Sequence, residues 1–157
     1  MSEGKPLQDL LTEAQEGRLS VRFGGTGPDT VRVDVEEFVA IERDCESFKN
    51  LIRELQRVAD EIADREVWGL GENTEELTSA QTLVRRFREK ARGSDNSVHA
   101  VLEQHYRIVD DLQQLHRLIA QRYQETDAEF ASRYGELMAA VPGAGVSGGR
   151  SAPQDRA

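Results

Sequence analysis

The sequence contains almost no cysteine, and this excludes one common way of stabilising a small protein. Cys45 stands alone among 157 residues, so no disulfide can form within the chain. The disulfide-bonded scaffolds of small secreted domains are therefore excluded. We interpret Cys45 as a small buried hydrophobe, with a disulfide to a second chain as the alternative.

Long apolar runs and aromatic residues are also scarce. No stretch approaches the ~20 apolar residues that span a bilayer, and residues 1–30 lack the apolar segment of a secretory signal. We therefore expect the protein to be made in the cytoplasm without a signal peptide. Hydrophobic residues make up 38% of the chain and aromatic residues only 6%. That balance is typical of long amphipathic helices with narrow apolar stripes.

An excess of positive charge is missing as well. The chain has 29 acidic and 20 basic residues and a net charge of −9. A surface of this sign repels phosphate backbones and anionic lipids, so we expect neither nucleic acid nor a membrane surface as the partner. The one basic run, residues 85–92, lies near a predicted helix C-terminus, where basic side chains complement the helix dipole. We interpret it as a solvated or partner-facing patch.

Glycine and proline are absent from residues 34–62, and there the strongest pattern of the chain begins. Asp34 and Glu37 have the spacing of a capping box, which predicts a helix start. Apolar residues then recur in alternating steps of three and four, the pattern of a heptad seam, and Leu51 and Val58 widen it. The seam residues of this predicted helix are Phe38, Ile41, Cys45, Phe48, Ile52, Leu55, Ala59 and Ile62.

A turn is predicted after this helix, where glycine returns to the sequence. Trp68 is followed by Gly69 and Gly71, and either glycine can adopt the left-handed conformation that ends a helix. Asn73 and Glu76 then have capping-box spacing, which predicts a second helix start. The seam resumes in this helix at Leu77, Ala80, Val84, Phe87 and Ala91.

Gly93 interrupts the pattern, and Asn96 or Ser97 can cap a further helix. The three-four spacing continues there as far as Ile119 and then slips. The seam residues of this last stretch are Val98, Val101, His105, Ile108, Leu112, Leu115 and Ile119.

These patterns predict an all-α fold over residues 34–140, either an antiparallel helical hairpin or a three-helix coiled-coil bundle, since short connections favour antiparallel neighbours. Residues 1–33 form an N-terminal extension, with a short helix around Leu10 and a small β-hairpin about the glycine-rich residues 24–29. Residues 141–157 are rich in Gly, Ser, Pro and Ala, which predicts disorder. A thin seam on long helices leaves apolar surface that one chain does not cover, and this indicates a partner helix pair.

The sequence offers little for catalysis or for binding a cofactor or metal. A carboxylate-bridged metal site in a helical bundle needs Glu-x-x-His pairs, and none of His99, His105 and His116 has a glutamate three residues before it. Cys45 takes a seam position, where a thiol is inert. No glycine run is followed by the Lys-Ser/Thr of a phosphate loop. We therefore predict a non-catalytic protein without cofactor or metal.

The order of a helix, a turn with tryptophan and glycine, and a second helix with a late tyrosine resembles the Trp-X-Gly superfamily, helical-hairpin proteins associated with type VII secretion in actinobacteria. The resemblance spans residues 34–135. At the turn it rests on Trp68, Gly69 and Gly71, with glycine one and three residues after the tryptophan instead of two. It implies an antiparallel hairpin that pairs with another hairpin, as a homodimer or heterodimer, in a four-helix bundle.

Tyr123 and Asp127 match the Tyr-x-x-x-Asp/Glu export signal that the same resemblance implies near the end of the last helix, although Tyr106 and Asp110 also match it. The resemblance implies a secretion substrate or partner that is recognised through its seam and through Tyr123 and Asp127, one turn apart on a helix face. The alternative is a cytoplasmic coiled-coil adaptor or structural protein that self-associates through the same seam. Tyr123 is then an ordinary seam residue and Asp127 a solvated acid.

Overall fold

The computed structural model describes residues 6–18 and 34–141, and all regular secondary structure in these ranges is helical. The all-α prediction is therefore confirmed. The short helix expected around Leu10 is present. The predicted β-hairpin about residues 24–29 lies outside the described residues, as does the predicted disordered tail, residues 141–157, apart from its first residue. The helices are α1 (Gln8–Gln15), α2 (Val35–Asp64), α3 (Thr78–Ala91), α4 (Val98–Thr126) and α5 (Ala128–Ala139).

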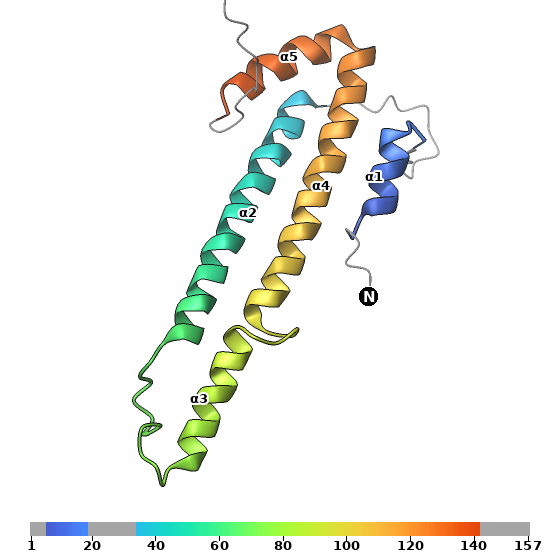
Figure 1. Ribbon diagram of the computed structural model, residues 1–157. Coiled ribbons are helices and arrows are strands. Elements are labelled where there is room, and N and C mark those ends of the chain that lie inside the picture. The colour runs from blue at the N-terminus through green and yellow to red at the C-terminus, as the bar shows by residue number, and fades with distance from the viewer. Residues whose placement is uncertain (1–5, 19–33, 142–157) are drawn as a thin grey trace, which may run out of the picture.

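The two long helices α2 and α4 lie side by side and run in opposite directions (Figure 1). Residues near the start of α2 contact residues near the end of α4, as in the bonds of Glu42 to Arg117, and the order reverses toward the other end, where Gln56 bonds His99. The shorter α3 precedes α4 in the chain and lies roughly in line with it, on the other side of a loop. It packs mainly on α2. We call the two long helices the α2–α4 pair.

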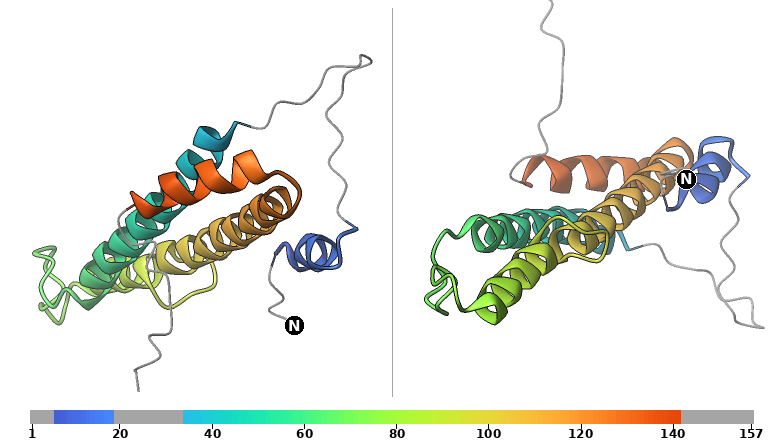
Figure 2. Two further views of the ribbon diagram at one scale, coloured as in Figure 1. Left: turned by 90° about the horizontal axis from the view of Figure 1, so that it is seen from above. Right: turned by 60° about the horizontal axis from the view of Figure 1, so that its bottom comes forward.

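The remaining helices cover only part of this pair (Figure 2). Helix α1 lies beside α4 on the side away from α2, and α5 lies across the end of the pair, contacting both α2 and α4. The backbone N–H of Leu7 donates to the buried carboxylate of Asp111 at 3.2 Å, which anchors α1 to α4. No helix within residues 6–18 and 34–141 combines the length and the hydropathy needed to cross a membrane.

Three helices begin at side-chain caps. The Asp34 carboxylate accepts from the N–H of Glu36 at 3.0 Å and fixes the start of α2, as the sequence predicts. Ser97 accepts from the N–H of Ala100 at 3.3 Å at the start of α4. Asp127 accepts from the N–H of Phe130 at 3.0 Å and begins α5, a helix that the spacing did not predict as separate.

The connection from α2 to α3 departs from the predicted turn. Helix α2 ends at Asp64, before the glycines, and α3 begins at Thr78 with no side-chain cap, so the prediction of a helix start at Asn73 and Glu76 is wrong. Both glycines instead shape the loop: Gly69 has φ 74° and Gly71 has φ 87°.

The Glu72 carboxylate organises the tip of this loop. It accepts hydrogen bonds from the backbone N–H groups of Trp68, Gly69 and Leu70. These bonds hold the pKa of Glu72 below its ordinary value, because backbone donors favour the charged carboxylate. The Trp68 indole stacks on Phe87 of α3, with ring centroids 5.5 Å apart, so the tip is tied to the helix that follows it.

Candidate interaction surface

Helix α2 carries two parallel stripes, and only one of them faces α4. Ile52 and Ala59 are buried against α4, as are two polar residues, Glu42 and Gln56. Phe38 reaches His116 of α4, with ring centroids 4.5 Å apart. The inner surface of the α2–α4 pair is therefore a mixture of apolar and polar side chains.

One polar cluster in this inner surface centres on Glu42, whose side chain is only 7% exposed. Its carboxylate accepts from Arg117 Nε at 2.9 and 3.0 Å, and from Gln113 Nε2 at 2.8 Å. Gln113 is 1% exposed and also reaches the Glu42 carbonyl. These bonds join the two helices and fix the register of α2 against α4, and they satisfy the Glu42 carboxylate, although the buried Gln113 Oε1 accepts no hydrogen bond from the described residues.

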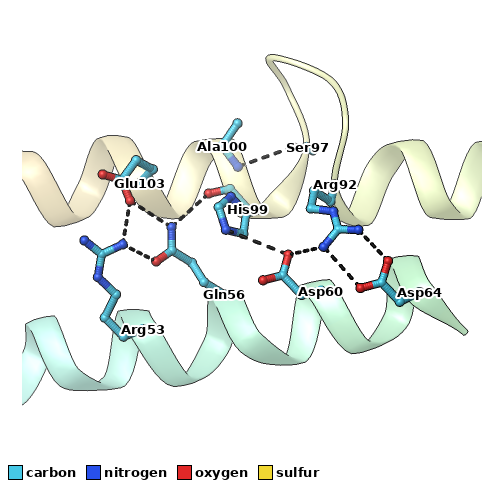
Figure 3. A network of polar contacts seen from close by, with 9 residues as sticks. All are labelled: Arg53, Gln56, Asp60, Asp64, Arg92, Ser97, His99, Ala100 and Glu103. Carbon is cyan, nitrogen blue, oxygen red and sulfur yellow. Dashed lines mark hydrogen bonds and ion pairs between the residues drawn. The ribbon is translucent and has the colours of Figure 1, made fainter.

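A second polar network lies on one side of the line where the helices meet (Figure 3). Arg53 donates to Glu103 at 2.7 Å and to Gln56 at 2.8 Å, and Gln56 bonds Glu103 at 3.0 Å. The Arg53 guanidinium also stacks on Tyr106, 3.8 Å from the ring centroid. Further along, Arg92 pairs with the carboxylates of α2 near its end. We call this side of the pair the polar face.

The other stripe of α2 and the matching stripe of α4 remain uncovered within the described residues. Their members are three, four or seven residues apart along each helix and are 37–53% exposed. In a protein whose buried hydrophobic set includes four alanines among nine residues, this is the larger apolar feature. We call these ten residues the apolar face: Ile41, Phe48, Leu51, Leu55, Val58, Ile62, Val98, Val101, Ile108 and Leu112.

Helix geometry puts both stripes of the apolar face on the same side of the pair. Successive residues turn by about 100° around a helix. Arg53 and Glu103 therefore lie a fraction of a turn to one side of the contact line, and they bond each other there. Leu55 and Leu112 lie a similar fraction of a turn to the opposite side of their own helices. Since the bonded residues share one face, the two leucines share the opposite one.

Neither small helix shields the apolar face. Helix α1 packs on the outer flank of α4, near Asp111. Helix α5 packs over the polar face. There Phe130 contacts Phe38, with ring centroids 5.5 Å apart, and Arg133 pairs with Glu36. On α3, Leu83 and Phe87 are 42% and 43% exposed and extend the apolar surface toward the tip.

The predicted seam is therefore divided between two surfaces. Of the residues predicted as core or interface, those that the structure buries or half-buries are Phe38, Ile52, Val84, Leu115 and Ile119. Those that it leaves exposed are Ile41, Phe48, Leu55, Ile62, Phe87, Ile108 and Leu112. Cys45 is half-buried, and burial raises the pKa of its thiol. The polar members of the inner surface, Glu42 and Gln113, have the spacing of a seam but not its hydrophobicity, so the heptad pattern does not identify them.

The second predicted feature, Tyr123 with Asp127, lies at the corner between α4 and α5. Asp127 does not lie within the helix that carries Tyr123, because its extended backbone (φ −134°, ψ 107°) ends α4 and its carboxylate caps α5. The prediction that the two lie on one continuous helix face is therefore wrong. Tyr123 packs against Phe38 and Phe130. Both predicted residues line an open groove of about 850 Å³ between α5 and the start of α2.

The aromatic corner also holds a buried histidine. Both ring nitrogens of His116 are buried and neither has a hydrogen-bond partner. Burial lowers the pKa of His116, because the charged imidazolium is poorly solvated there, and the nearby Glu42 opposes this effect. His116 is therefore neutral in the folded protein near pH 7.

We expect this histidine to make the fold sensitive to mild acid. The unfolded chain takes up the His116 proton at an ordinary pKa of about 6.5 and the folded chain only at lower pH, so the free energy of unfolding falls as the pH drops below about 6.5. One proton limits the slope to about 1.4 kcal/mol per pH unit. Urea unfolding at pH 7.5, 6.5 and 5.5 measures how the free energy of unfolding depends on pH. His116→Leu should flatten the profile, whereas His105→Gln, at an exposed site on the same helix, should not; equal slopes in both variants would contradict the assignment.

The last feature considered is a possible metal centre. No group of three or more His, Cys, Asp or Glu side chains in residues 6–18 and 34–141 is arranged to hold a metal ion. Comparison with known proteins finds no family model, no curated protein and no solved structure that matches the chain. The apolar face is therefore the main functional candidate that the structure itself provides.

Proposed function

We propose that this protein is a non-catalytic protein–protein interaction module, a helical hairpin that docks onto another helix pair to form a bundle. The apolar face carries the proposal. Full burial of a Val, Leu, Ile or Phe side chain contributes about 1.5–3 kcal/mol, so burying the exposed half of ten such residues contributes roughly 10 kcal/mol. That is comparable with the whole stability of a small domain, about 5–15 kcal/mol. A partner that covers this face gains enough to offset the cost of association.

We further propose that the partner system is type VII secretion, with the protein as a substrate or as the partner of one. The support is the resemblance over residues 34–135 together with two placements. Trp68 and the glycines lie at the tip between α2 and α3, and Tyr123 lies at the far end of α4, lining a groove with Asp127. Tyr123 supplies a rigid amphipathic anchor and Asp127 a neighbouring charge.

Location in the native host tests the secretion proposal. We expect the full-length protein in the culture filtrate and the Tyr123→Ala variant in the cytosol, because the variant lacks the anchor at the α4–α5 corner. Tyr106→Ala is the matched control, since Tyr106 belongs to the other Tyr-x-x-x-Asp sequence but lies under Arg53 in the middle of α4. It should be exported like the wild type.

Thermal unfolding of both variants, followed by circular dichroism, separates loss of recognition from loss of the fold. Each substitution removes one packed tyrosine ring, so both should lower the melting temperature by similar amounts. Retention of all three proteins in the cytosol, with a lysis control, would refute export. It would leave the second candidate, a cytoplasmic coiled-coil adaptor that self-associates, which the apolar face supports equally well.

A further inference from the structure

We infer that one flank of α4, between Asp111 and Arg122, is a binding site for a short helix, and that α1 is the tethered helix that fills it. Helix α1 leaves this site and rebinds while the α2–α4 pair stays folded. The site lies apart from the apolar face, so the inference goes beyond the proposed function and does not depend on it.

The N-terminal end of α1 is capped by α4 and not by its own sequence. Helix α1 starts after Leu7, which provides no capping side chain. The N–H of Leu7 instead donates to the Asp111 carboxylate at 3.2 Å, and Asp111 is 1% exposed. A carboxylate at this end of a helix is favourable, because the helix dipole places partial positive charge there. Asp111 is therefore a capping residue that the site supplies.

The C-terminal end of α1 lies beside a positive charge of α4. Gly17, in the left-handed conformation with φ 70°, ends the helix: its N–H donates to the carbonyl of Ala14 at 3.1 Å, and the next N–H donates to that of Glu13 at 2.8 Å. The Arg122 guanidinium is close to this end, since a Cβ on Gly17 would lie 2.8 Å from Nη2 of Arg122. A cation is favourable here, because the last carbonyl groups of a helix carry partial negative charge.

The spacing of the two charges matches the length of α1. Asp111 and Arg122 are eleven residues apart on α4, about 16 Å along a helix. Leu7 and Gly17 are ten residues apart, about 15 Å along a helix. Helix α1 therefore runs along α4 in the same direction (Figure 1), and each of its ends lies beside the charge that stabilises it. A helix bound in the opposite direction would have the unfavourable charge at both ends.

Between its ends α1 makes one small apolar contact. Leu11 and Ala14 are 3% and 7% exposed and lie three residues apart, on one face of the helix. The neighbouring Leu10 is 40% exposed. The site therefore fits a short amphipathic helix with a narrow apolar stripe.

Helix α1 is bound weakly enough to leave. With eight residues it is shorter than the roughly 12–15 residues that an isolated helix needs in water, so it is helical only while it is bound. Among the described helices it contacts α4 alone, and Ile52 and the Glu42 cluster hold the α2–α4 pair together without it. Segments with few buried contacts open well below the free energy of global unfolding. When α1 is away, the flank accepts a helix of the same kind from a partner protein.

Hydrogen exchange of the full chain tests whether α1 opens by itself. We expect the amides of α1 to exchange at least about tenfold faster than the amides in the middle of α2 and α4. Leu11→Asp should remove the remaining protection of α1 and leave that of the pair unchanged. Leu10→Asp is the matched control, because it places the same charge at the exposed neighbour, and it should leave α1 protected. One common exchange rate for α1 and the pair would overturn the inference, as would loss of protection throughout the pair in Leu11→Asp.

A separate peptide tests the binding site. The probe is a synthetic peptide of residues 1–18, added to the isotope-labelled full chain and followed by NMR. The Leu11→Asp chain should bind the peptide, with shifts at the amides of Asp111 and Arg122. Wild type should bind it at least about tenfold more weakly, because a tethered α1 competes at an effective concentration in the millimolar range. A peptide that itself carries Leu11→Asp should not bind.

The role of the cap is tested in the same titration. Asp111→Asn, added to the Leu11→Asp chain, should weaken peptide binding by about tenfold, since hydrogen bonds to charged groups are stronger than those to neutral ones. Glu129→Gln removes an exposed carboxylate of α5 and should leave the affinity unchanged. Absence of peptide binding to the Leu11→Asp chain would overturn the helix-binding site. So would shifts confined to the apolar face, at Leu55 and Ile108.

Discussion

Replacing Ile52 by aspartate should unfold the protein. Ile52 is 1% exposed, in the middle of the inner surface between α2 and α4. The substitution removes a buried aliphatic side chain and leaves a carboxylate without a partner in its place, at a combined cost of at least about 4 kcal/mol. This is a large share of the stability of a domain of this size. We expect the far-ultraviolet helical signal and the cooperative thermal transition to be largely lost at 25 °C.

The control for this result is Asn50→Asp, which adds the same charge two residues away on the exposed side of α2. It should change the melting temperature by little, since surface substitutions away from special features have small effects. An Ile52→Asp protein with full helicity and an unchanged melt would show that Ile52 does not belong to the inner surface.

Removing the cation from the Glu42 cluster should produce the second large effect. Arg117→Met leaves the Glu42 carboxylate nearly buried, with Gln113 as its remaining close donor from α4. Losing a charged hydrogen-bond partner of a buried carboxylate costs about 2–3 kcal/mol here, since Arg117 itself is 54% exposed. Urea denaturation should show a lower midpoint with an unchanged slope.

The penalty of Arg117→Met should shrink when the buried charge is also removed. In the double variant Glu42→Gln/Arg117→Met the neutral amide needs no counter-charge, so the protein should be more stable than the Arg117→Met single variant. Arg57→Met is the control, because it breaks only the exposed pair with Glu61 and should cost less than about 1 kcal/mol. Strict additivity of the two substitutions in the cluster would contradict a coupled pair.

The polar members of the inner surface explain why the sequence could not identify the faces of α2. From spacing alone the apolar residues between Phe38 and Ile62 form a single seam. A broad apolar stripe contains more than one series of residues spaced by three and four, and spacing does not show which series faces the neighbouring helix. In the structure Ile52 faces α4 while Leu55, three residues later, remains exposed. Glu42 fills an inner position because Gln113 and Arg117 satisfy it across the helix pair. Such bonds depend on residues about seventy positions away, and local periodicity contains no information about them.

The same reason accounts for the corner at Asp127. A tyrosine followed four residues later by an acidic residue is compatible with two structures. Both residues can form a recognition signal on one helix, or the tyrosine can end one helix while the acidic residue caps the next. An aspartate side chain caps a helix only where the chain turns, and after this turn Phe130 packs against Phe38, which lies far earlier in the sequence. The α1 contact with Asp111 is likewise a tertiary feature.

By itself the sequence determined that this protein is all-α, that Asp34 caps α2, that Asn96 or Ser97 caps α4, and that apolar residues recur with heptad spacing, because capping and periodicity are local properties of the chain. Only the tertiary structure decided which half of the seam packs inside and which half forms the apolar face. The physical reason is that burial depends on side chains of the other helix: the side of α2 that finds hydrogen-bond and packing partners on α4 is buried, and the other stripe stays exposed within the described residues.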